Sequence, residues 1–414
     1  MNRPRLLFLS QQLPFPPDGG AKIRTFNTLK ELSEDFDITA LCFVRWKKAY
    51  QDRDISKERE ALSEHGSIHT FPLPQSQSKI RFALDHLRAL LSRRVYTRFV
   101  FASSQFAHAL RSQLEQHRYD LVHADSLDLS GYFDLLDGLP IVCVHHDVQS
   151  SLLARRASRE TSLLRRTYAS LQATAMQEEE ESWIPKVALN VTVSPVDRDR
   201  LQARIPDGTY EVFPNGVDTE YFFPKSASGA GVVFVGGTSW FPNLDALHFF
   251  CGEVLPILRQ KLPDLPVTWV GRATAGEIEE FSERYDITLT GHVPDVRPYL
   301  WNADCVIVPI RVGGGTRIKI LDAWASGKAV VSTTIGCEGL DAEHNVNIRV
   351  ADSPQEFAAN VSEVLGNDAL ARRLGEEGRR TAVDKYSWAR IGETMRKKYH
   401  ALISQAPKPQ SPTE

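Results

Sequence analysis

The chain has 414 residues, which is enough for two domains with full hydrophobic cores, and 42% of its residues are hydrophobic, as in ordinary globular proteins. Its net charge of −3 at pH 7 excludes a bulk electrostatic attraction to nucleic acid. The five cysteines are widely spaced and form no metal-type pairs, which excludes a disulfide scaffold and favours a reducing cytoplasm.

Neither a signal peptide nor a membrane span is predicted. Two arginines precede an apolar run near the N-terminus, but this run covers only Leu6 to Leu9 and is too short for a signal peptide. No stretch approaches the roughly 20 apolar residues that a membrane-spanning helix needs. We therefore expect a cytoplasmic protein.

The chain begins with a predicted strand, a glycine loop and a helix. The apolar run from Arg5 to Ser10 predicts a buried strand, and a helix is expected from about Ala21 to Leu32. The loop between them ends in Gly19 and Gly20, where the backbone can approach a ligand closely, and Lys22 follows with a positive charge. A plain turn explains this local pattern equally well, so both interpretations stay open.

A basic amphipathic stretch occupies residues 79–101. Its apolar residues recur at helical spacing, and six cations accompany a single acid, Asp85. Such a helix can rest on an anionic membrane. It can equally pack against its own domain and leave a basic face in water. The sequence leaves both interpretations open.

Two further buried strands are predicted at residues 119–124 and 140–144, and they lead to a candidate catalytic histidine. The second ends in a His-His-Asp triplet that contains His146. This is the carboxyl edge of the predicted sheet, where open α/β sheets bind their ligands. We therefore select His146 as a site residue; a structural histidine is the alternative. Asp125 and Asp128 do not have the Asp-x-Asp spacing of a metal site, so no metal is predicted there.

The middle of the chain contains a long charged stretch and then a candidate domain boundary. Residues 150–182 are rich in arginine early and in glutamate late, which predicts one or two exposed helices with solvated charged faces. The turn dipeptide Asn215-Gly216 and the polar, Gly-rich tract after it indicate a boundary between two domains.

The second half of the chain repeats the alternation of strands and helices. An apolar run from Val232 enters a turn at Gly237, which Thr238 follows. Strands and helices then alternate to about residue 350, and helices fill the rest up to a tail rich in Pro, Gln and Ser that we expect to be disordered. This pattern predicts an α/β protein with two doubly wound, Rossmann-like domains that face each other across a cleft.

The segment 312–327, VGGGTRIKILDAWASG, carries the clearest ligand-binding pattern. After a predicted strand, a glycine loop enters an amphipathic helix. Thr316 can cap this helix and leave its first amides pointing outward, which makes an anion site. Arg317 and Lys319 oppose the helix dipole there, so they suit an anion better than they suit the helix. A phosphate is the predicted ligand, and a tight loop with solvated basic residues is the alternative.

This segment and its continuation, GGGTRIKILDAWASGKAVVSTTIGCEGL, resemble the donor-binding segment of retaining glycosyltransferases of family 4. The sequence PNGVD at 214–218 likewise resembles the passage between the two domains of these enzymes. The resemblance implies the GT-B fold. It implies an N-terminal acceptor domain at 1–208, a C-terminal nucleotide-sugar domain at 209–386, a terminal helix at 387–404 that crosses back to the N-terminal domain, and the tail at 405–414.

The resemblance also implies roles for the candidate residues. Asp322 would hold the ribose of the nucleotide, the loop around Val293 would receive the base, and His146 would touch the donor sugar. Gly19 and Gly20 would lie over the diphosphate near the acceptor. The remaining candidates for substrate binding are Lys22, Gly237, Thr238, Gly314, Gly315, Thr316, Arg317 and Lys319.

Two features depart from the family pattern. Many members have glutamates where this chain has Gly314 and Asp322, and many have an Arg/Lys pair just after the turn at Gly237, where this chain has no cation. We expect Arg317 and Lys319 to replace that pair. The departures keep open a catalytically silent binding subunit as an alternative; an enzyme similar to sugar-nucleotide 2-epimerases is another.

The resemblance implies a hexosyltransferase that needs neither a metal nor a cofactor besides its nucleoside diphosphate sugar. Its acceptor would be a glycan or a lipid-linked molecule, in surface polysaccharide or lipid-linked glycan synthesis. Together with the basic stretch at 79–101, this leads us to expect a cytoplasmic enzyme that contacts the inner face of the membrane peripherally and has no nucleic-acid partner.

Overall fold

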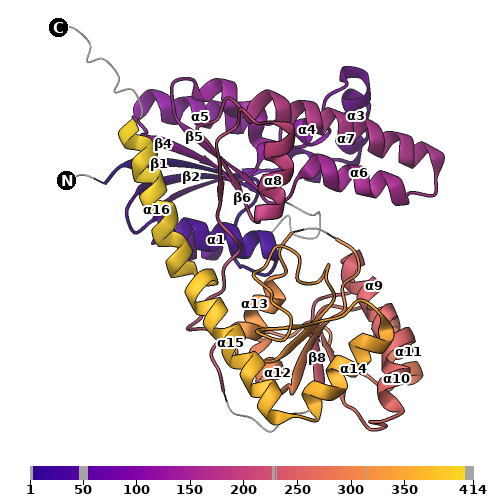
Figure 1. Ribbon diagram of the computed structural model, residues 1–414. Helices are drawn as coiled ribbons and strands as arrows, with labels where there is room; N and C mark the ends of the chain where they lie inside the picture. Colours follow the sequence, from indigo (N-terminus) through magenta and orange to yellow (C-terminus); the bar gives the residue numbers. More distant parts are fainter. Residues whose placement is uncertain (1–2, 46–54, 226–228, 230, 314, 406–414) are drawn as a thin grey trace, which may run out of the picture. The chain divides into compact units, whose positions relative to one another are not determined.

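The computed structural model describes residues 3–45, 55–225, 229, 231–313 and 315–405. The chain divides into two compact units, residues 1–213 with 392–414 (unit 1) and residues 214–391 (unit 2). Each unit contains one parallel sheet, and helices lie on both sides of the strands (Figure 1). Apart from Gln405, the tail that was expected to be disordered lies outside the described residues.

Unit 1 is built on a seven-stranded parallel sheet with the order β3-β2-β1-β4-β5-β6-β7. Its strands are β1 (Arg5–Ser10), β2 (Asp37–Val44), β3 (Ser67–Pro72), β4 (Leu121–Ala124), β5 (Ile141–His145), β6 (Leu189–Thr192) and β7 (Tyr210–Val212). The central strands are apolar and buried because helices cover both faces of the sheet. β1 pairs with β2 on one side and with β4 on the other, so the strand order reverses between β1 and β4.

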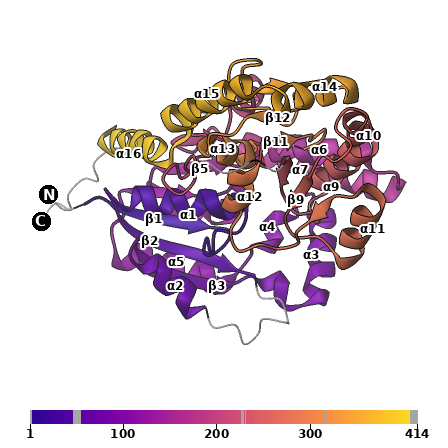
Figure 2. The ribbon, with the colours of Figure 1, turned by 90° about the horizontal axis from the view of Figure 1, so that it is seen from below.

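The helices of unit 1 are α1 (Gly20–Leu32), α2 (Ser56–Ser63), α3 (Lys79–Ser92), α4 (Thr97–Val100), α5 (Ser104–Gln116), α6 (Gln149–Arg159), α7 (Leu163–Trp183) and α8 (Pro195–Arg204), with the 3₁₀ helices η2 (Pro74–Gln77) and η3 (Leu127–Leu136). Seen from below, α1 runs alongside β1 and β2 (Figure 2). The described helices include none that is both long and apolar enough to cross a membrane.

Unit 2 has a six-stranded parallel sheet with the order β10-β9-β8-β11-β12-β13. Its strands are β8 (Val232–Val235), β9 (Val267–Val270), β10 (Thr288–Leu289), β11 (Cys305–Val308), β12 (Val330–Ser332) and β13 (Arg349–Val350). Its helices are α9 (Phe241–Phe249), the π-helical turn η4 (Phe250–Val254), α10 (Leu255–Arg259), α11 (Ala275–Tyr285), α12 (Arg297–Asn302), α13 (Ile318–Ala325), α14 (Pro354–Leu365) and α15 (Asp368–Tyr386).

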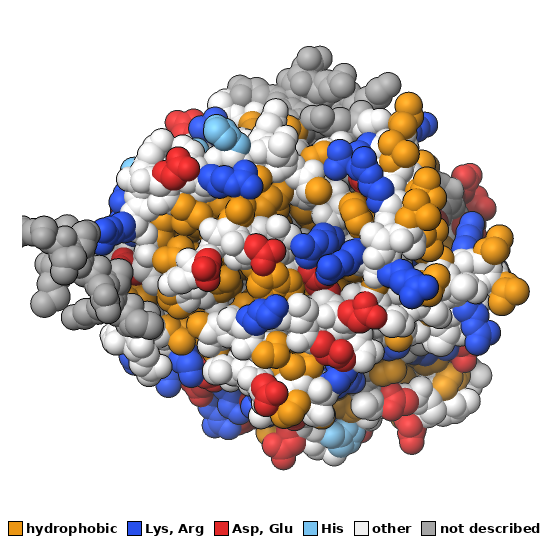
Figure 3. Space-filling model, turned by 90° about the horizontal axis from the view of Figure 1, so that it is seen from above, with side chains coloured by type: hydrophobic (Ala, Val, Ile, Leu, Met, Phe, Trp, Pro, Cys, Tyr) orange, Lys and Arg blue, Asp and Glu red, His pale blue; other side chains and the backbone are white. Residues whose placement is uncertain are grey.

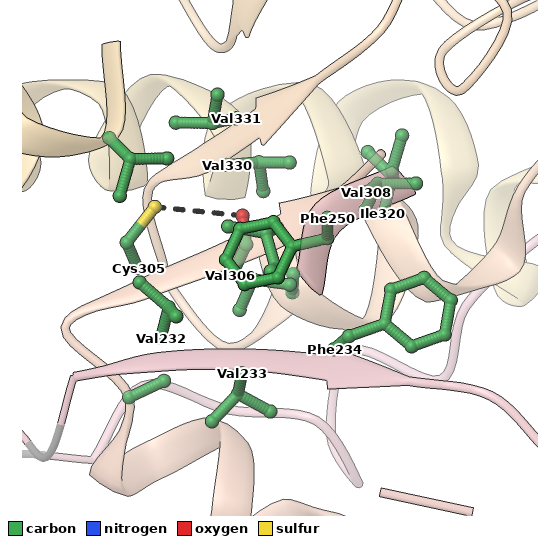
Figure 4. Close-up of a cluster of buried hydrophobic side chains, with 14 of the residues drawn as sticks. Val232, Val233, Phe234, Phe250, Cys305, Val306, Val308, Ile320, Val330 and Val331 are labelled. Carbon is green, nitrogen blue, oxygen red and sulfur yellow. Dashed lines mark hydrogen bonds between the residues drawn. The ribbon is translucent and has the colours of Figure 1, made fainter. Parts of the chain in front are cut away.

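The core of unit 2 fixes the helix that carries the candidate donor residues. Side chains of β8, β11 and β12 pack together, and Ile320 of α13 lies fully buried among them (Figure 4). Leu321 and Trp324 of the same helix are also fully buried. Since burying each of these side chains stabilises the fold by about 1.5–3 kcal/mol, α13 has a defined rotation about its axis. The residues between the buried positions therefore have defined directions as well.

The terminal helix α16 (Trp388–Gln405) begins in unit 2 and belongs to unit 1 from Gly392 onward. In unit 1 it is held by both charge and packing. Arg396 lies 3.0 Å from Glu31 Oε2, and Tyr399 is fully buried. Gly392 lies so close to Glu31 that a Cβ would clash with it, so this position requires glycine.

The charged stretch at 150–182 differs from its prediction in one respect. It forms two helices, α6 and α7, but part of its acidic run is buried. The Glu179 side chain is 3% exposed and pairs with Arg98 at 2.8 Å. Glu180 is also buried and accepts a hydrogen bond of 2.6 Å from Ser150 Oγ. The prediction of a solvated acidic face is wrong here, because these carboxylates find partners from distant segments.

Candidate functional site

The candidate donor residues of unit 2 gather where its strand order reverses, between β8 and β11. β8 runs into the turn at Gly236 and Gly237, and β11 runs toward the glycine loop that precedes α13. In open parallel sheets, the carboxyl ends of strands at such a reversal form the usual ligand-binding crevice, because the connections leave in opposite directions. The fold thus brings two glycine-rich turns, far apart in sequence, to one edge of the sheet.

Lys319 lies at the centre of this edge. Its Nζ donates a 2.8 Å hydrogen bond to Asn243 Oδ1 and lies 3.9 Å from the centroid of the Phe234 ring. Asn243 in turn donates to Gly237 O at 2.8 Å, so one amide links the lysine to the turn after β8. A Cβ on Gly236 would lie 2.7 Å from Lys319 Nζ. The ammonium therefore occupies the place where the sequence lacks a cation near Gly237.

The surroundings of Lys319 disfavour its charged form. Burial lowers its pKa well below the usual value, and repulsion by Arg317 adds to this, while Asp322 acts in the opposite direction. Within the described residues, Lys319 forms no ion pair with a carboxylate. A lysine of this kind gains its proton most readily when an anion arrives.

Arg317 and Thr316 shape the start of α13, and the predicted cap is wrong. The helix begins at Ile318 with Arg317 at the N-cap and without a side-chain cap. Thr316 instead accepts a 2.6 Å hydrogen bond from Asn215 Nδ2, because the segment after β7 reaches this loop. Arg317 folds back over the glycine loop, where its Nη1 donates to Gly315 O at 2.9 Å. Gly315 has φ +71°, which favours glycine; Gly314 lies outside the described residues.

Asp322 lies one turn after Lys319 on α13. It is half-buried, and burial raises the pKa of its carboxyl to about 8, with Lys319 opposing the shift. The predicted loop at Gly291–Asp295 lies in the same unit, where Val293 packs against the core. Asp295 Oδ1 accepts a 2.9 Å hydrogen bond from the Arg297 amide just before α12, whose N-cap is Val296.

Thr238 has a structural role in the turn after β8. Its amide donates to Arg272 O at 2.8 Å, and its hydroxyl donates to Glu277 Oε2 at 2.9 Å. The side chain is 4% exposed. Thr238 therefore holds the turn in place, and Asn243, which the sequence did not single out, makes the contact with Lys319. Its only sequence signal was its position at the start of a helix, just after the glycine turn.

Gly19, Gly20 and Lys22 begin α1 in unit 1. Gly19 is the N-cap with extended backbone (φ −164°), and a Cβ there would find open space within 4 Å. Lys22 Nζ pairs with Asp18 at 2.9 Å. The loop thus has room for a ligand beside Gly19, but the charge of its lysine is balanced by its neighbour.

His146 joins a buried polar cluster at the reversal point of the unit 1 sheet, between β1 and β4. Its Nε2 donates a 2.7 Å hydrogen bond to the carbonyl of Asp125 and lies 3.5 Å from the Asp125 carboxylate. That carboxylate also accepts from Thr25 Oγ1 at 2.7 Å and from Ser10 Oγ at 3.3 Å. Burial alone would raise the pKa of Asp125, but interactions with His146 and His123 outweigh it and hold the pKa well below its usual value.

Three other residues complete this cluster, and the sequence assigned no role to them. Arg24 is 3% exposed, and burial lowers its pKa to about 10 against the pull of Asp125. His123 stacks on Phe8 at 4.3 Å between ring centroids and shares a 2.8 Å hydrogen bond with Tyr399 of α16. Helix periodicity indicates only approximately which way Arg24 points. Tyr399 is 276 residues from His123 in the sequence, so local patterns cannot predict the hydrogen bond between these two residues.

Comparison with known families identifies the protein family of this chain. A family profile described as Glycosyltransferase Family 4 matches residues 19–221, and one described as Glycosyl transferases group 1 matches residues 229–367. The chain belongs to glycosyltransferase family 4. The predicted family is therefore confirmed, and the two profiles divide near the boundary between the two units.

Individual relatives of this family 4 chain are distant. The MMP α-(1→4)-mannosyltransferase of Mycolicibacterium hassiacum is 25% identical over 303 residues, which cover 69% of this chain and 71% of the relative. An uncharacterized 44.6 kDa protein in the cps region of Klebsiella pneumoniae is 28% identical over 138 residues, or 31% of this chain. The chain spans 36% of the length of that Klebsiella relative.

Solved structures confirm the GT-B fold. HepE of Anabaena in complex with UDP and glucose superposes with a TM-score of 0.67 and 16% identity, over 96% of this chain and 99% of HepE. Its sequence has diverged far more than its fold. The substrate-binding residues of this family 4 chain therefore have to be argued from its own geometry.

Unit 1 of this family 4 chain also contains a cavity of about 730 Å³ beside the polar cluster. Its walls include Arg81, Arg98, Phe99, Tyr132 and Asp128. Burial raises the pKa of Asp128, while hydrogen bonds and the charge of His146 oppose the shift. Asp128 therefore belongs to both features, since it lines the cavity and lies within electrostatic reach of His146.

Proposed function

We propose that the chain is a retaining hexosyltransferase that moves a sugar from a nucleoside diphosphate sugar to an acceptor. The observation that carries the proposal is the position of Lys319, whose ammonium lies against the glycine turn after β8 and beside the start of α13. Backbone amides and a cation at one sheet edge suit a diphosphate. Family membership supports this ligand, and so does HepE, a structural relative in complex with UDP and glucose.

The chemistry needs charge at the leaving group. As the bond between the sugar and the diphosphate breaks, negative charge grows on the phosphate oxygens and the sugar becomes cation-like. Lys319 would stabilise that charge with a hydrogen bond, and the amides at the start of α13 would add to it. Arg317 lies near enough to assist if its guanidinium turns from Gly315 O toward the ligand. In this proposal these cations take the place of a metal, and no other cofactor is involved.

Asp322 and the loop around Val293 would hold the nucleoside. Asp322 replaces the glutamate of many family members with a side chain shorter by one methylene, and it would contact the ribose hydroxyls. Its raised pKa means that the carboxyl carries a proton at neutral pH in the free protein, so it can donate to one hydroxyl and accept from another.

Unit 1 would supply the acceptor side. His146 donates through Nε2 to Asp125 O, which leaves Nδ1 to accept a hydrogen bond from a sugar hydroxyl. The open space beside Gly19 and the cavity at Asp128 offer room for an acceptor. We propose a glycan or lipid-linked acceptor in surface polysaccharide synthesis, which agrees with the cps-region relative. The five free, buried cysteines support a cytoplasmic location.

Calorimetric titration with UDP, GDP, ADP and CMP tests the donor site. We expect one nucleoside diphosphate to bind, and Lys319→Ala to weaken its binding by about 1.5–3 kcal/mol, the usual range for a charge-assisted hydrogen bond. Lys385→Ala is the matched control, because Lys385 is an exposed unit 2 lysine that pairs with Asp341. Its affinity should equal that of the wild type.

Two results would contradict the proposal. If no nucleotide binds, the chain is a silent subunit of the same fold. If a sugar nucleotide binds but is isomerised in the absence of an acceptor, the enzyme is an epimerase. Product analysis by NMR after turnover with an acceptor then tests whether the anomeric configuration is retained.

A further inference from the structure

Helix α3 of unit 1 is oriented the opposite way from an ordinary amphipathic helix. Its buried residues are Asp85, whose side chain is fully buried, and Ala89. Its apolar stripe faces outward, and the stripe residues are 74%, 43%, 51% and 78% exposed at Ile80, Leu84, Leu87 and Leu91. A helix packed on its own domain buries such a stripe. Here the carboxylate lies inside and the leucines lie outside, so α3 packs on its own domain through a face other than its apolar stripe.

Specific contacts hold α3 in this orientation. The Asp85 carboxylate pairs with Arg81 at 2.9 Å and with Arg88 at 3.5 Å. His86 stacks on Tyr96 at 3.9 Å between centroids and hydrogen bonds the Tyr168 hydroxyl of α7 at 2.5 Å. Rotating the helix to bury its leucines would break all of these contacts and expose a buried ion pair. The outward stripe is therefore a feature of the fold.

The start of α7 extends the apolar surface. Leu164 is 84% exposed and Leu171 is 53% exposed. They flank Tyr168 at helical spacing, and Tyr168 contacts α3 through His86, so the two helices present one surface. We call it the α3–α7 surface, made up of Ile80, Leu84, Leu87, Leu91, Leu164 and Leu171. In the view from above, hydrophobic side chains line the right-hand margin, where α3 and α7 lie (Figure 3).

The exposed charged side chains around this surface are positive. Its acid, Asp85, is buried beneath it and is paired with Arg81 and Arg88. The exposed charged residues of the two helix segments and their ends are Lys79, Arg88, Arg93, Arg94, Arg165 and Arg166. Exposed leucines bordered by arginines match the boundary of an anionic bilayer. A second copy of the same surface matches poorly, because two-fold pairing would set cations against cations.

We propose that the α3–α7 surface docks unit 1 on an anionic lipid bilayer, with its leucines among the acyl chains and its arginines on lipid phosphates. Arg81 of α3 also lines the 730 Å³ cavity with Arg98 and Asp128, so a docked bilayer borders that cavity. This last step rests on the proposed function, and it assigns the acceptor to the lipid-linked class: a polar head group enters the cavity while its lipid stays in the membrane.

Vesicle sedimentation of the full chain tests the docking. We expect binding to vesicles of equal parts phosphatidylcholine and phosphatidylglycerol, little binding to phosphatidylcholine alone, and weaker binding at high salt. Leu87→Asp should lower the partition coefficient about tenfold or more, because a leucine that would insert among the acyl chains is replaced by a charge. Val383→Asp is the matched control, since Val383 is an exposed aliphatic residue of unit 2, and it should bind like the wild type.

Charge reversal separates electrostatic attraction from insertion. Arg93→Glu should lower binding to the anionic vesicles and flatten its salt dependence, whereas Lys261→Glu at an exposed position of unit 2 should leave both unchanged. Circular dichroism establishes that each variant is folded. Equal binding of Leu87→Asp and wild type would overturn the proposal. So would a lipid-free dimer that Leu87→Asp dissociates, because the occupant would then be a second copy.

Nucleotide titration distinguishes failure of this proposal from failure of the proposed function. Vesicle binding lost in Leu87→Asp, in a protein that binds no nucleotide, supports the surface and overturns the transferase. Nucleotide binding without vesicle binding overturns the surface and leaves the donor site supported. If the acceptor is lipid-linked, Leu87→Asp should lower turnover on acceptor in vesicles and spare turnover on a water-soluble acceptor analogue.

Discussion

The two units place their polar residues at the same topological point but balance the charge there in opposite ways. In unit 1, between β1 and β4, Lys22 pairs with Asp18 and Arg24 is attracted by Asp125. In unit 2, between β8 and β11, Lys319 meets the neutral amide of Asn243 and the ring of Phe234. Identical topology thus yields one cluster with balanced charges and one site whose lysine forms no ion pair with a carboxylate among the described residues, and only the second is prepared for a polyanion.

The glycine turns of the two units also differ in how tightly they are packed. At Gly236 a Cβ would collide with Asn243 and Lys319, whereas at Gly19 it would find open space. The unit 2 turn is packed around its cation before any ligand arrives. The unit 1 turn leaves a space that an acceptor would fill. This contrast predicts which substitutions act on the fold and which act on the ligand.

The largest expected effect is on the stability of unit 1. Asp125→Ala leaves the buried guanidinium of Arg24 without its compensating charge, so we expect the free energy of unfolding to fall by about 3–5 kcal/mol in urea titrations. Asp199→Ala is the control, because Asp199 belongs to an exposed ion pair with Arg198, and it should change stability by at most about 1 kcal/mol. Equal stability of the two variants would show that the unit 1 cluster is not charge-balanced.

The next effect is on donor binding in unit 2. Gly236→Ala puts a methyl group 2.7 Å from Lys319 Nζ, at a φ of +156° that favours glycine, and should displace the ammonium. We expect nucleotide affinity to fall about 100-fold, or about 2.7 kcal/mol, in calorimetry. Gly252→Ala is the matched control: a Cβ there meets nothing within 4 Å, so its affinity should be unchanged. Unchanged affinity in Gly236→Ala would remove the turn from the site.

The architecture was predictable because it depends on local patterns. The apolar run at Arg5–Ser10 forms β1 with the predicted bounds, and the alternation of strands and helices gave the two parallel sheets. The glycine loop before α13 was equally visible, since positive φ at Gly313 and Gly315 needs glycine. These features arise from short stretches of sequence whose periodicity or backbone preference is strong.

The partners of the site residues were not predictable, because they are long-range. Asn243 contacts Lys319, which is 76 residues away in the sequence. Asn215 donates a hydrogen bond to the Thr316 hydroxyl that was expected to cap α13. The orientation of α3 was ambiguous for a similar reason. Its amphipathic pattern gives the stripe but not its direction, and the direction is set by the buried pairing of Asp85 with arginines and by contacts with α7.

A smaller effect concerns the pH dependence of stability in unit 2. The pKa of Asp322 is raised to about 8 in the fold, against about 3.9 when unfolded, so the unfolded chain releases its proton first as pH rises. Stability should therefore fall between about pH 4 and pH 8. Asp322→Asn removes this penalty, and we expect it to be about 1–2 kcal/mol more stable than wild type at pH 7.5 and similar to it near pH 4.

Thermal unfolding across this pH range measures the effect, and nucleotide titration of the same variant gives its functional counterpart. Like the protonated carboxyl of Asp322, the Asn amide can donate one hydrogen bond and accept another, so affinity should change little while stability rises. Asp304→Asn is a useful reference, because Asp304 accepts a 2.8 Å hydrogen bond from the Gly231 amide outside the site. A stability gain that did not depend on pH would mean that the carboxyl of Asp322 is already ionised in the fold.

The smallest expected effect on stability is at Gly19, and it gives the sharpest test of the contrast between the two turns. The extended backbone of Gly19 suits any residue and a Cβ there has free space, so Gly19→Ala should cost about 0.5 kcal/mol or less of unfolding free energy. Nucleotide affinity should stay the same, because the diphosphate cations are in unit 2. Turnover with acceptor should fall several-fold if the acceptor fills the space beside Gly19. Gly276→Ala, also in open space at the start of a helix, provides the control. Full turnover in Gly19→Ala would identify the unit 1 loop as a plain turn and confine the glycine-dependent chemistry to unit 2.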